Sequence, residues 1–275
     1  MLLSPESVRG VFDLDAYVGR VGLTGRPAIA ELHRAHVGAI PFENLDPHRG
    51  VAVALDEEPL ALKMLDGGRG GYCFEQKLLF KAAMEALGAR VEPMLARVRW
   101  RAPADVVRPL THATLRVEVD GRAWLADVGF GAGTLLEPIP FGPGGPYEQS
   151  GWSFRVVEEA ADLLVLQIFH DGQWADLYAF MPRPVPHVDI EVSNWFTSTH
   201  PGSPFVTGVL VATVREDGAF VSLSDWGKLA LVVRTPEGST ATPVDRQQIP
   251  RLLEEHFGLG GFVLGERGRI ALAGD

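Results

Sequence analysis

The period of the hydrophobic pattern changes at Gly88, and this change limits the folds that the chain can adopt. Before Gly88, apolar residues recur at helical spacing after Pro27, between residues 57 and 65, and from Cys73 to about Leu87. After Gly88, short runs rich in Val, Leu and aromatic residues are separated by Asp, Gly and Pro, which is typical of antiparallel strands. The pattern predicts an α+β protein in which a helical bundle precedes a β-rich part.

The β-rich part is divided by a Pro-rich bend, MPRPVPHVD, near residue 185. Six strand-like runs come before this bend: VEPMLARVRW, HATLRVEV, RAWLADV, WSFRVV, DLLVLQIF and QWADLYAF. Three further runs and a helix near residues 249–257 follow it. We therefore expect an N-terminal helical bundle over residues 1–90, a central antiparallel β-barrel over 91–190 and a C-terminal α/β lid over 191–275.

The charge and the apolar content of the chain exclude several classes of function. A net charge of −10 argues against a nucleic-acid groove and against adhesion to anionic lipid. No apolar stretch approaches the roughly 20 residues of a membrane span, and the first ten residues, MLLSPESVRG, lack the apolar run of a secretory signal. We expect a cytoplasmic protein that binds neither nucleic acid nor membrane, and a homo-oligomer is compatible with these features.

Cys73 is the only cysteine, so an intrachain disulfide and a zinc site of several cysteines are excluded. It lies in the glycine-rich stretch GGRGGYCFEQ, immediately before a predicted helix. Glycines permit a sharp turn, and the start of a helix lowers the pKa of a thiol from its usual value of about 8.5. The alternative is a small buried hydrophobic side chain. The glycine stretch favours a nucleophile.

A thiol nucleophile needs a base and a group that orients it, and a predicted β-hairpin contains both. In THATLRVEV-DG-RAWLADVGFG, Asp120-Gly121 forms a two-residue type I′ turn. This register places Leu115 opposite Ala126 on an apolar face and makes His112 and Asp127 diagonal neighbours on the other face. A slip of one residue would separate them and is forbidden by the apolar pattern. The alternative is a solvent-facing pair.

The other histidines carry weaker signals. His33 and His36 have helical spacing but lack the carboxylate pattern of a zincin, so we interpret them as ordinary helix residues. No P-loop or G-x-G-x-x-G is present. We predict no metal site.

Several segments resemble the motifs of the arylamine N-acetyltransferase family. They follow one another in the family's order along nearly the whole chain. These segments are IPFENLD (40–46), RGGYCFE (69–75), ARVRW (96–100), THATLRV (111–117), DVGFG (127–131) and STHPGSPF (198–205).

The resemblance implies a cysteine-protease-like triad of Cys73, His112 and Asp127 within the three-part fold described above. It also implies acetyl-CoA as the cosubstrate, an acetyl thioester on Cys73, and a small aromatic amine or hydrazine as the acceptor. The sequence departs from the family pattern at Lys77, where the family often has Asn. This departure bears on polar contacts to coenzyme A and leaves the triad intact.

The resemblance also points to residues that bind the substrates. Phe42, Phe130 and Phe205 are expected to line a flat apolar pocket, although core packing explains Phe42 equally well. A second set, which the resemblance places beside the coenzyme A arm, is Thr111, Gly129, Gly131 and His200. The two glycines are equally compatible with the end of a hairpin.

Two further polar residues, Glu43 and Arg69, are expected to pair structurally near the site. Three alternatives to an arylamine N-acetyltransferase stay open. An amide synthase uses the same fold and triad to close a polyketide chain onto an aromatic amine. A papain- or transglutaminase-like thiol hydrolase does not depend on acetyl-CoA. A non-catalytic binding protein keeps its ligand affinity when Cys73 is replaced by Ala.

Overall fold

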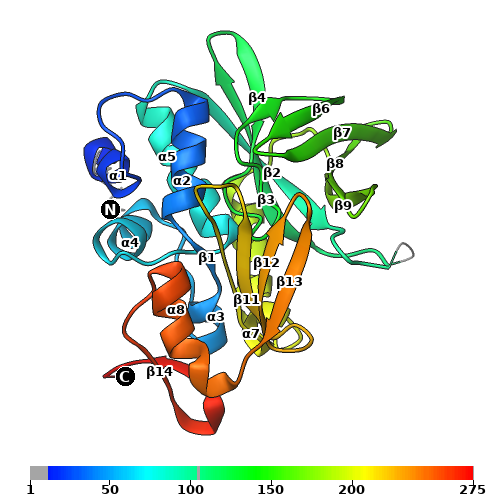
Figure 1. Cartoon of the computed structure of the whole chain (residues 1–275). Coiled ribbons are helices and arrows are strands. Elements are labelled where there is room, and N and C mark those ends of the chain that lie inside the picture. Colours follow the sequence, from blue (N-terminus) through cyan, green and yellow to red (C-terminus); the bar gives the residue numbers. More distant parts are fainter. Residues whose placement is uncertain (1–11, 104–105, 275) are drawn as a thin grey trace, which may run out of the picture.

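The computed structural model describes residues 12–103 and 106–274. The segment MLLSPESVRG, on which the prediction about secretion rests, lies outside these residues. A group of helices, a large antiparallel sheet and a smaller sheet with its own helix make up the α+β fold (Figure 1). No helix in the described part of the chain has the length and apolar character needed to cross a membrane.

The N-terminal part is helical, as the sequence predicted. The segment predicted for residues 57–65 continues from α4 into a π-helical turn, η1, and the segment that begins at Cys73 is a single helix, α5. The elements here are α1 (Leu14–Arg20), α2 (Ile29–Ala39), β1 (Phe42–Glu43), α3 (Leu45–Arg49), α4 (Glu57–Ala61), η1 (Leu62–Asp66) and α5 (Cys73–Ala86).

The central part is an eight-stranded antiparallel sheet in the order β5-β4-β3-β2-β9-β8-β7-β6, which curves into a nearly closed barrel (Figure 1). All six predicted strand runs are strands of this sheet. Its members are β2 (Arg90–Val98), β3 (Leu110–Val119), β4 (Arg122–Ala126), β5 (Ile139–Pro140), β6 (Gly144–Gln149), β7 (Trp152–Ala160), β8 (Leu163–His170) and β9 (Gln173–Phe180).

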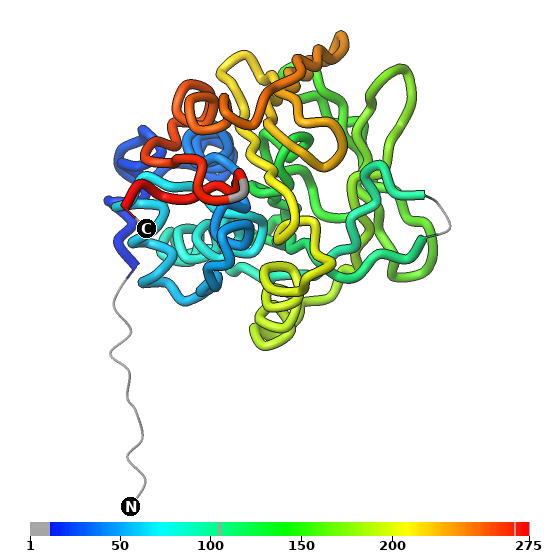
Figure 2. The backbone as a smooth tube through the Cα atoms, turned by 90° about the horizontal axis from the view of Figure 1, so that it is seen from below, coloured from blue at the N-terminus to red at the C-terminus, as the bar shows by residue number. Residues whose placement is uncertain are grey.

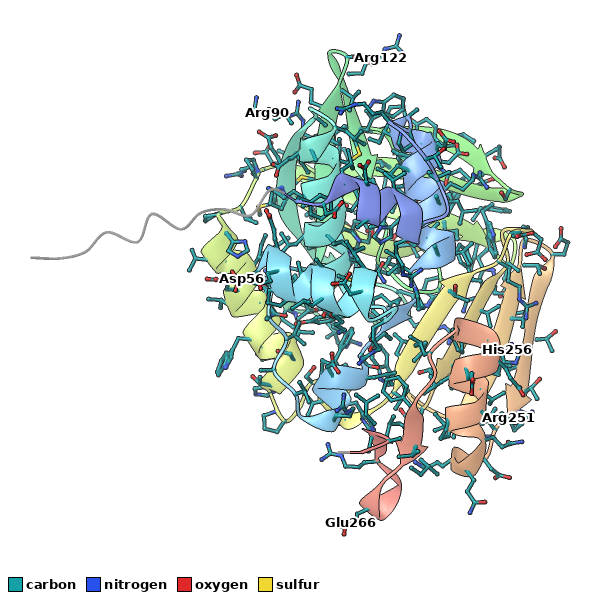
Figure 3. The ribbon with its side chains drawn as sticks, turned by 90° about the vertical axis from the view of Figure 1, so that its left-hand side faces the viewer. Asp56, Arg90, Arg122, Arg251, His256 and Glu266 are labelled. Carbon is teal, nitrogen blue, oxygen red and sulfur yellow. The ribbon has the colours of Figure 1, made fainter. Side chains whose placement is uncertain are left out.

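The register of the β3–β4 hairpin agrees with the prediction. Leu115 faces Ala126, and both are fully buried. Asp120 and Gly121 have φ angles of 51° and 71°, as a type I′ turn requires. The tip of this hairpin, which Arg122 marks in Figure 3, projects from one end of the molecule, whereas the labelled Glu266 lies at the other end.

The smaller sheet has the order β1-β10-β11-β12-β13, and its strand β1 comes from the helical part. Phe42 of β1 pairs with Ala212 of β10, which joins the segment predicted as residues 1–90 to the sheet of the predicted lid. The other strands are β10 (Leu210–Val214), β11 (Phe220–Ser224), β12 (Ala230–Thr235) and β13 (Gly238–Pro243).

Two helices follow the Pro-rich bend and were not predicted. They are α6 (His187–Thr199), which begins directly after Pro186, and the short α7 (Pro204–Thr207). Helix α6 packs on β3 and thereby covers the strand that carries His112.

The C-terminal segment returns to the helical part. The predicted helix α8 (Ile249–Phe257) is present, after a short 3₁₀ turn, η2 (Arg246–Gln248). The hairpin of β14 (Phe262–Leu264) and β15 (Ile270–Leu272) encloses a second 3₁₀ turn, η3 (Glu266–Gly268), and packs against α3 (Figure 2). Phe262, Ile270 and Leu45 share one apolar cluster, so the chain end closes over the helical part.

Candidate active site

A glycine loop places Cys73 at the first position of α5. A side chain on Gly70 would have its Cβ 1.9 Å from the carbonyl oxygen of Pro41, so only glycine fits there. The loop is held by a hydrogen bond from the N–H of Glu43 to the carbonyl of Gly71, at 3.1 Å. The Glu75 carboxylate accepts a hydrogen bond from the N–H of Tyr72 at 3.0 Å and so fixes the helix start.

The thiol of Cys73 contacts the backbone of strand β3 at Thr111 and Ala113, the two residues that flank His112. Its sulfur donates a hydrogen bond to the carbonyl of Thr111 at 3.6 Å, and the backbone N–H of Ala113 points to the sulfur. The side chain is only 2% exposed.

The burial of Cys73 changes the expected chemistry of its thiol. Burial raises the pKa of Cys73, although the Lys77 ammonium and the backbone N–H groups of Ala113 and Phe74 act in the opposite direction. The sequence predicted a lowered pKa for this thiol, because of the helix start and a nearby imidazole. Desolvation opposes that effect in the folded protein.

His112 and Asp127 are in direct contact, and this face of the hairpin is buried rather than solvent-facing. The Nε2 atom of His112 lies 2.7 Å from Oδ2 of Asp127. The carboxylate is an acceptor only, so Nε2 carries the proton and Nδ1 is left as the free base. Burial lowers the pKa of His112, while Asp127 acts to raise it.

The second oxygen of the Asp127 carboxylate has two further partners. The N–H of Gly129 donates to Oδ1 at 3.1 Å, and the ammonium of Lys77 lies 2.5 Å from the same oxygen. Although burial alone would raise the pKa of Asp127, the Lys77 ammonium and His112 hold it well below its usual range. Asp127 is therefore ionised in the folded protein.

His33 also belongs to this site, although the sequence indicated an ordinary helix residue. Its Nε2 accepts a hydrogen bond from the backbone N–H of Asp127 at 3.1 Å, and its Nδ1 donates to the carbonyl of Leu136 at 3.2 Å. The imidazole is fully buried, and burial lowers its pKa to about 3. A neutral histidine therefore fixes the backbone that carries the carboxylate.

Aromatic rings surround the imidazole. The ring of Phe130 lies 5.1 Å from that of His112 in an edge-to-face arrangement, and the ring of Tyr178 lies at 4.8 Å. Phe42 shares an apolar cluster with Cys73, and Phe205 packs on Phe42 with the ring centroids 6.2 Å apart. Of the three phenylalanines predicted to line a pocket, Phe130 packs on the imidazole, and Phe42 and Phe205 belong to the apolar cluster that contains Cys73.

The other predicted substrate-binding residues are in different settings. Thr111 contacts the sulfur through its carbonyl, and Gly131 is a buried residue with a φ of +86°. Gly129 is packed against Lys77 and Gln76. His200 is exposed at the end of α6, where its ring stacks on Phe196.

A buried charge network holds the glycine loop, and it includes the predicted pair of Glu43 and Arg69. The guanidinium of Arg69 lies 2.6 Å from the Glu43 carboxylate and 3.1 Å from that of Asp46. The ammonium of Lys63 contacts Asp46 and Glu75, each at 2.7 Å. The network thus links α3 and η1 to the first turn of α5, which carries Cys73.

Two cavities are lined by residues other than Cys73. A cavity of about 330 Å³ lies between the end of α3 and the C-terminal hairpin, with Arg49 and Arg269 among its lining residues. A second one, of about 10 Å³, is lined by Phe42, Gln76 and Gly131. Within residues 12–103 and 106–274, no group of His, Cys, Asp and Glu is arranged to hold a metal ion.

A buried thiol at a helix start, which contacts the backbone of the two residues that flank a histidine, and a carboxylate paired with that histidine are the groups that nucleophilic acyl transfer requires. Comparisons with known proteins point to one family. A family model described as N-acetyltransferase matches residues 27–261. An arylamine N-acetyltransferase of Mycolicibacterium smegmatis is 44% identical over 220 residues, which are 76% of this chain and 78% of the relative.

Two further comparisons extend the similarity. The Mycobacterium bovis arylamine N-acetyltransferase is 36% identical over 267 residues, which cover 94% of this chain and 93% of the relative. The Mycobacterium marinum arylamine N-acetyltransferase, solved in complex with CoA, superposes with a TM-score of 0.84 at 37% identity and covers 90% of this chain and 92% of that one. The chain belongs to the arylamine N-acetyltransferase family.

Proposed function

We propose that this protein transfers an acetyl group from acetyl-CoA to a small aromatic amine or hydrazine, through a thioester on Cys73. The observation that carries the proposal is the contact of His112 Nε2 with Asp127 at 2.7 Å. The thiol of Cys73 contacts the backbone of Thr111 and Ala113, the two neighbours of His112 in the chain. The contact with Asp127 leaves Nδ1 of the imidazole as the base that a protonated thiol needs.

In the first half-reaction, Nδ1 of His112 takes the proton of the Cys73 thiol, and the thiolate attacks the acetyl carbonyl. The bond between the acetyl carbon and the sulfur of coenzyme A breaks, and the bond to the sulfur of Cys73 forms. The imidazolium then returns the proton to the departing coenzyme A thiolate. Asp127 keeps its negative charge and stabilises the imidazolium while it exists.

In the second half-reaction, the amine nitrogen attacks the thioester carbonyl. Nδ1 of His112 accepts a proton from the amine and passes it to the sulfur of Cys73 as the carbon–sulfur bond breaks. The products are the N-acetylated acceptor and the free thiol. Backbone N–H groups at the start of α5, those of Cys73 or Phe74, are proposed to stabilise the oxyanion because the first N–H groups of a helix have no intrahelical acceptor.

The choice of donor and acceptor rests on the family and on the aromatic surroundings of the thiol. The related Mycobacterium marinum enzyme was solved with CoA, which supports acetyl-CoA as the donor here. Phe42 and Phe205 share the apolar surroundings of Cys73, which suits a flat aromatic acceptor. We assign Thr111, Gly131 and His200 to the path of the coenzyme A arm, and Gly129 to the support of Asp127.

The test is the intact mass of the protein after acetyl-CoA is added without an acceptor. Wild-type protein gains one acetyl group, and Cys73→Ala gains none. Adding an arylamine discharges the acetyl-enzyme, and double-reciprocal plots at several fixed amine concentrations run parallel, as a ping-pong mechanism requires. Intersecting lines without any acetylated enzyme would assign the transfer to a ternary complex and contradict the role of Cys73.

The mass experiment, together with an assay of amide hydrolysis, separates the alternatives. An acetyl-enzyme that no arylamine discharges keeps the thioester chemistry and makes the amide synthase the leading hypothesis. Turnover of an amide without any acetyl-CoA identifies a thiol hydrolase. The identities of 44% and 36% to proteins named arylamine N-acetyltransferase support the acetyltransferase over both.

A further inference from the structure

A buried ammonium lies at the centre of the proposed site. The Nζ atom of Lys77 is 2.5 Å from Oδ1 of Asp127, and the two side chains are 1% and 0% exposed. Lys77 is one helical turn after Cys73 on α5, so the two side chains project from the same side of the helix. The residue therefore touches the carboxylate and lies close to the thiol.

Burying the Lys77 ammonium costs free energy, and the one carboxylate in close contact with it is that of Asp127. This pairing indicates that the lysine has a role at the site. A charged amine in a protein interior is tolerated only when it is paired, and Lys77 reaches the carboxylate that also binds His112. The absence of a side chain at Gly129 leaves space for the ammonium, because a Cβ at that position would lie 3.1 Å from Nζ of Lys77. Helix, glycine and carboxylate together hold the ammonium in one place.

We infer that Lys77 is a positioning residue of the acyl-transfer site, an inference that rests on the proposed function. Its ammonium anchors the Asp127 carboxylate beside His112 and offsets its negative charge, so that a thiolate forms on Cys73 in a site without net negative charge.

The charges of the site explain this role. With Lys77 and Asp127 both ionised, their charges cancel, and proton transfer from Cys73 to His112 creates a thiolate–imidazolium pair without changing the total. A neutral residue at position 77 would leave the carboxylate charge unbalanced, and a thiolate would then form beside an anion of like charge. In the folded protein the Lys77 ammonium lowers the pKa of Cys73 whereas the Asp127 carboxylate raises it.

The helices and strands that pack around the thiol and the carboxylate carry several other titratable groups. None of these groups places a second permanently positive side chain next to Asp127. Tyr72, His33 and Tyr178 are buried, and burial keeps the two phenols and the imidazole neutral. The groups are Tyr72 and Glu75 at the start of α5, Lys77 on α5, His33 on α2, His112 on β3, Asp127 after β4 and Tyr178 on β9. Glu75 is paired with Lys63.

The test compares three variants with the wild type. Lys77→Asn keeps a hydrogen-bond donor but removes the charge, and Lys77→Met removes both. Lys81→Asn is the matched control, because Lys81 lies one turn further along α5 and pairs with Glu85 near the surface. The readout is the rate of Cys73 alkylation by iodoacetamide as a function of pH, together with the melting temperature.

We expect the midpoint of the alkylation profile of Lys77→Asn to move upward by about one pH unit, which makes alkylation about tenfold slower at a pH below both midpoints. Lys81→Asn keeps the wild-type midpoint. A change in the access of iodoacetamide to the thiol would change the rate by the same factor at every pH and leave the midpoint in place. A shift of the midpoint therefore reports the loss of the Lys77 charge and not a change in packing.

A Lys77→Asn profile that superposes on the wild-type profile would overturn the inference, and so would a lowered melting temperature without any shift of the midpoint. If Lys77→Met fails to fold, the double variant Lys77→Met with Asp127→Asn removes both buried charges and is expected to regain the lost melting temperature. The alkylation profile needs no acetyl-CoA. A wild-type protein that never becomes acetylated therefore contradicts the proposed function without deciding the role of Lys77.

Discussion

The imidazole of His33 accepts a hydrogen bond from the backbone N–H of Asp127, a residue 94 positions later in the chain, at 3.1 Å. Since Nδ1 of the same ring donates to the carbonyl of Leu136, the ring is held in one neutral tautomer. A protonated ring would have no acceptor at Nε2 and would repel the N–H of Asp127. The position of the carboxylate therefore depends on an uncharged histidine on helix α2.

This dependence predicts how stability varies with pH. The pKa of His33 is about 3 in the folded protein and about 6.5 in the unfolded chain, so the unfolded state binds more protons between these values. This contribution to stability is complete above pH 6.5 and is lost as the pH falls, by up to about 1.4 kcal/mol per pH unit. Urea unfolding of the wild type and of His33→Gln from pH 5 to pH 7 checks this, and we expect a shallower pH dependence in the variant. His187→Gln, at an exposed position, is the control, and equal slopes for all three proteins would contradict the prediction.

The contact of Asp127 with His112 predicts a second outcome. In Asp127→Asn an amide can turn its N–H toward Nε2, which forces the ring proton onto Nδ1 and removes the base from the thiol. The rate of acetyl-enzyme formation should fall by up to about 10⁴-fold, with little change in the KM for acetyl-CoA. Rapid-quench mass spectrometry measures this rate. The control is Asp176→Asn, which changes a half-exposed carboxylate paired with Arg99. A loss of less than tenfold in Asp127→Asn would mean that the imidazole does not act as proposed.

The aromatic cluster next to Cys73 predicts an effect on the acceptor alone. Phe205 packs on Phe42 and on the ring of Tyr72, at centroid distances of 6.2 and 5.5 Å. Replacing it by Ala removes apolar surface worth about 1.5–3 kcal/mol, so the KM for an arylamine should rise by about 10- to 100-fold. The rate of acetylation by acetyl-CoA should stay near the wild-type value. Phe169→Ala, at an exposed position, is the control, and a slower acetylation step in Phe205→Ala would assign Phe205 to the donor instead.

The buried charge network under the glycine loop predicts that removing one of its cations lowers the free energy of unfolding. Arg69→Met leaves the carboxylate of Glu43 with Lys63 and that of Asp46 with Lys63 and Arg49, and should destabilise the fold by about 3–5 kcal/mol. Arg183→Met, which breaks an exposed pair with Asp162, should cost about 1 kcal/mol or less. Urea unfolding compares the two variants, and equal losses would show that burial does not set the strength of the network.

The helices and strands in which apolar residues recur at a regular spacing could be predicted from the sequence. The alternation of apolar residues in the β3–β4 hairpin has only one register that buries them, and this register brought His112 next to Asp127. The start of α5 at Cys73 was likewise marked by its glycines. These features are local, because each depends on residues within one hairpin or one helical turn.

The parts that the sequence did not predict depend on contacts between distant segments. Helix α6 has an inverted pattern: it buries Asn194 and Ser198 and exposes Trp195, so its hydrophobic residues do not mark the inner face. The burial of Lys77 and the contact of His33 with Asp127 arise only when α2 and α5 pack against the hairpin. A lysine and a histidine at helical spacing are normally surface or core residues, and nothing near them in the sequence indicates otherwise.

Gly129 allows the support of Asp127 to be tested without changing any charge. Its N–H donates to Oδ1 of Asp127 at 3.1 Å, and a Cβ at this position would lie 3.1 Å from both the Lys77 ammonium and the Gln76 side chain. Gly129→Ala should therefore displace the ammonium or the backbone by a few tenths of an ångström, and we expect acetyl-enzyme formation to slow by about 100-fold, because small misplacements in a site are costly.

The matched substitution is Gly38→Ala on the exposed side of α2, where an added Cβ meets no atom within 4 Å. Alanine is favoured over glycine inside a helix, so this variant should gain about 0.5–1 kcal/mol of stability and keep its acetylation rate. The two rates come from the same mass measurement, and thermal unfolding gives the two stabilities. If Gly129→Ala acetylates as fast as Gly38→Ala, then the spacing between Gly129, Lys77 and Asp127 does not control the reaction.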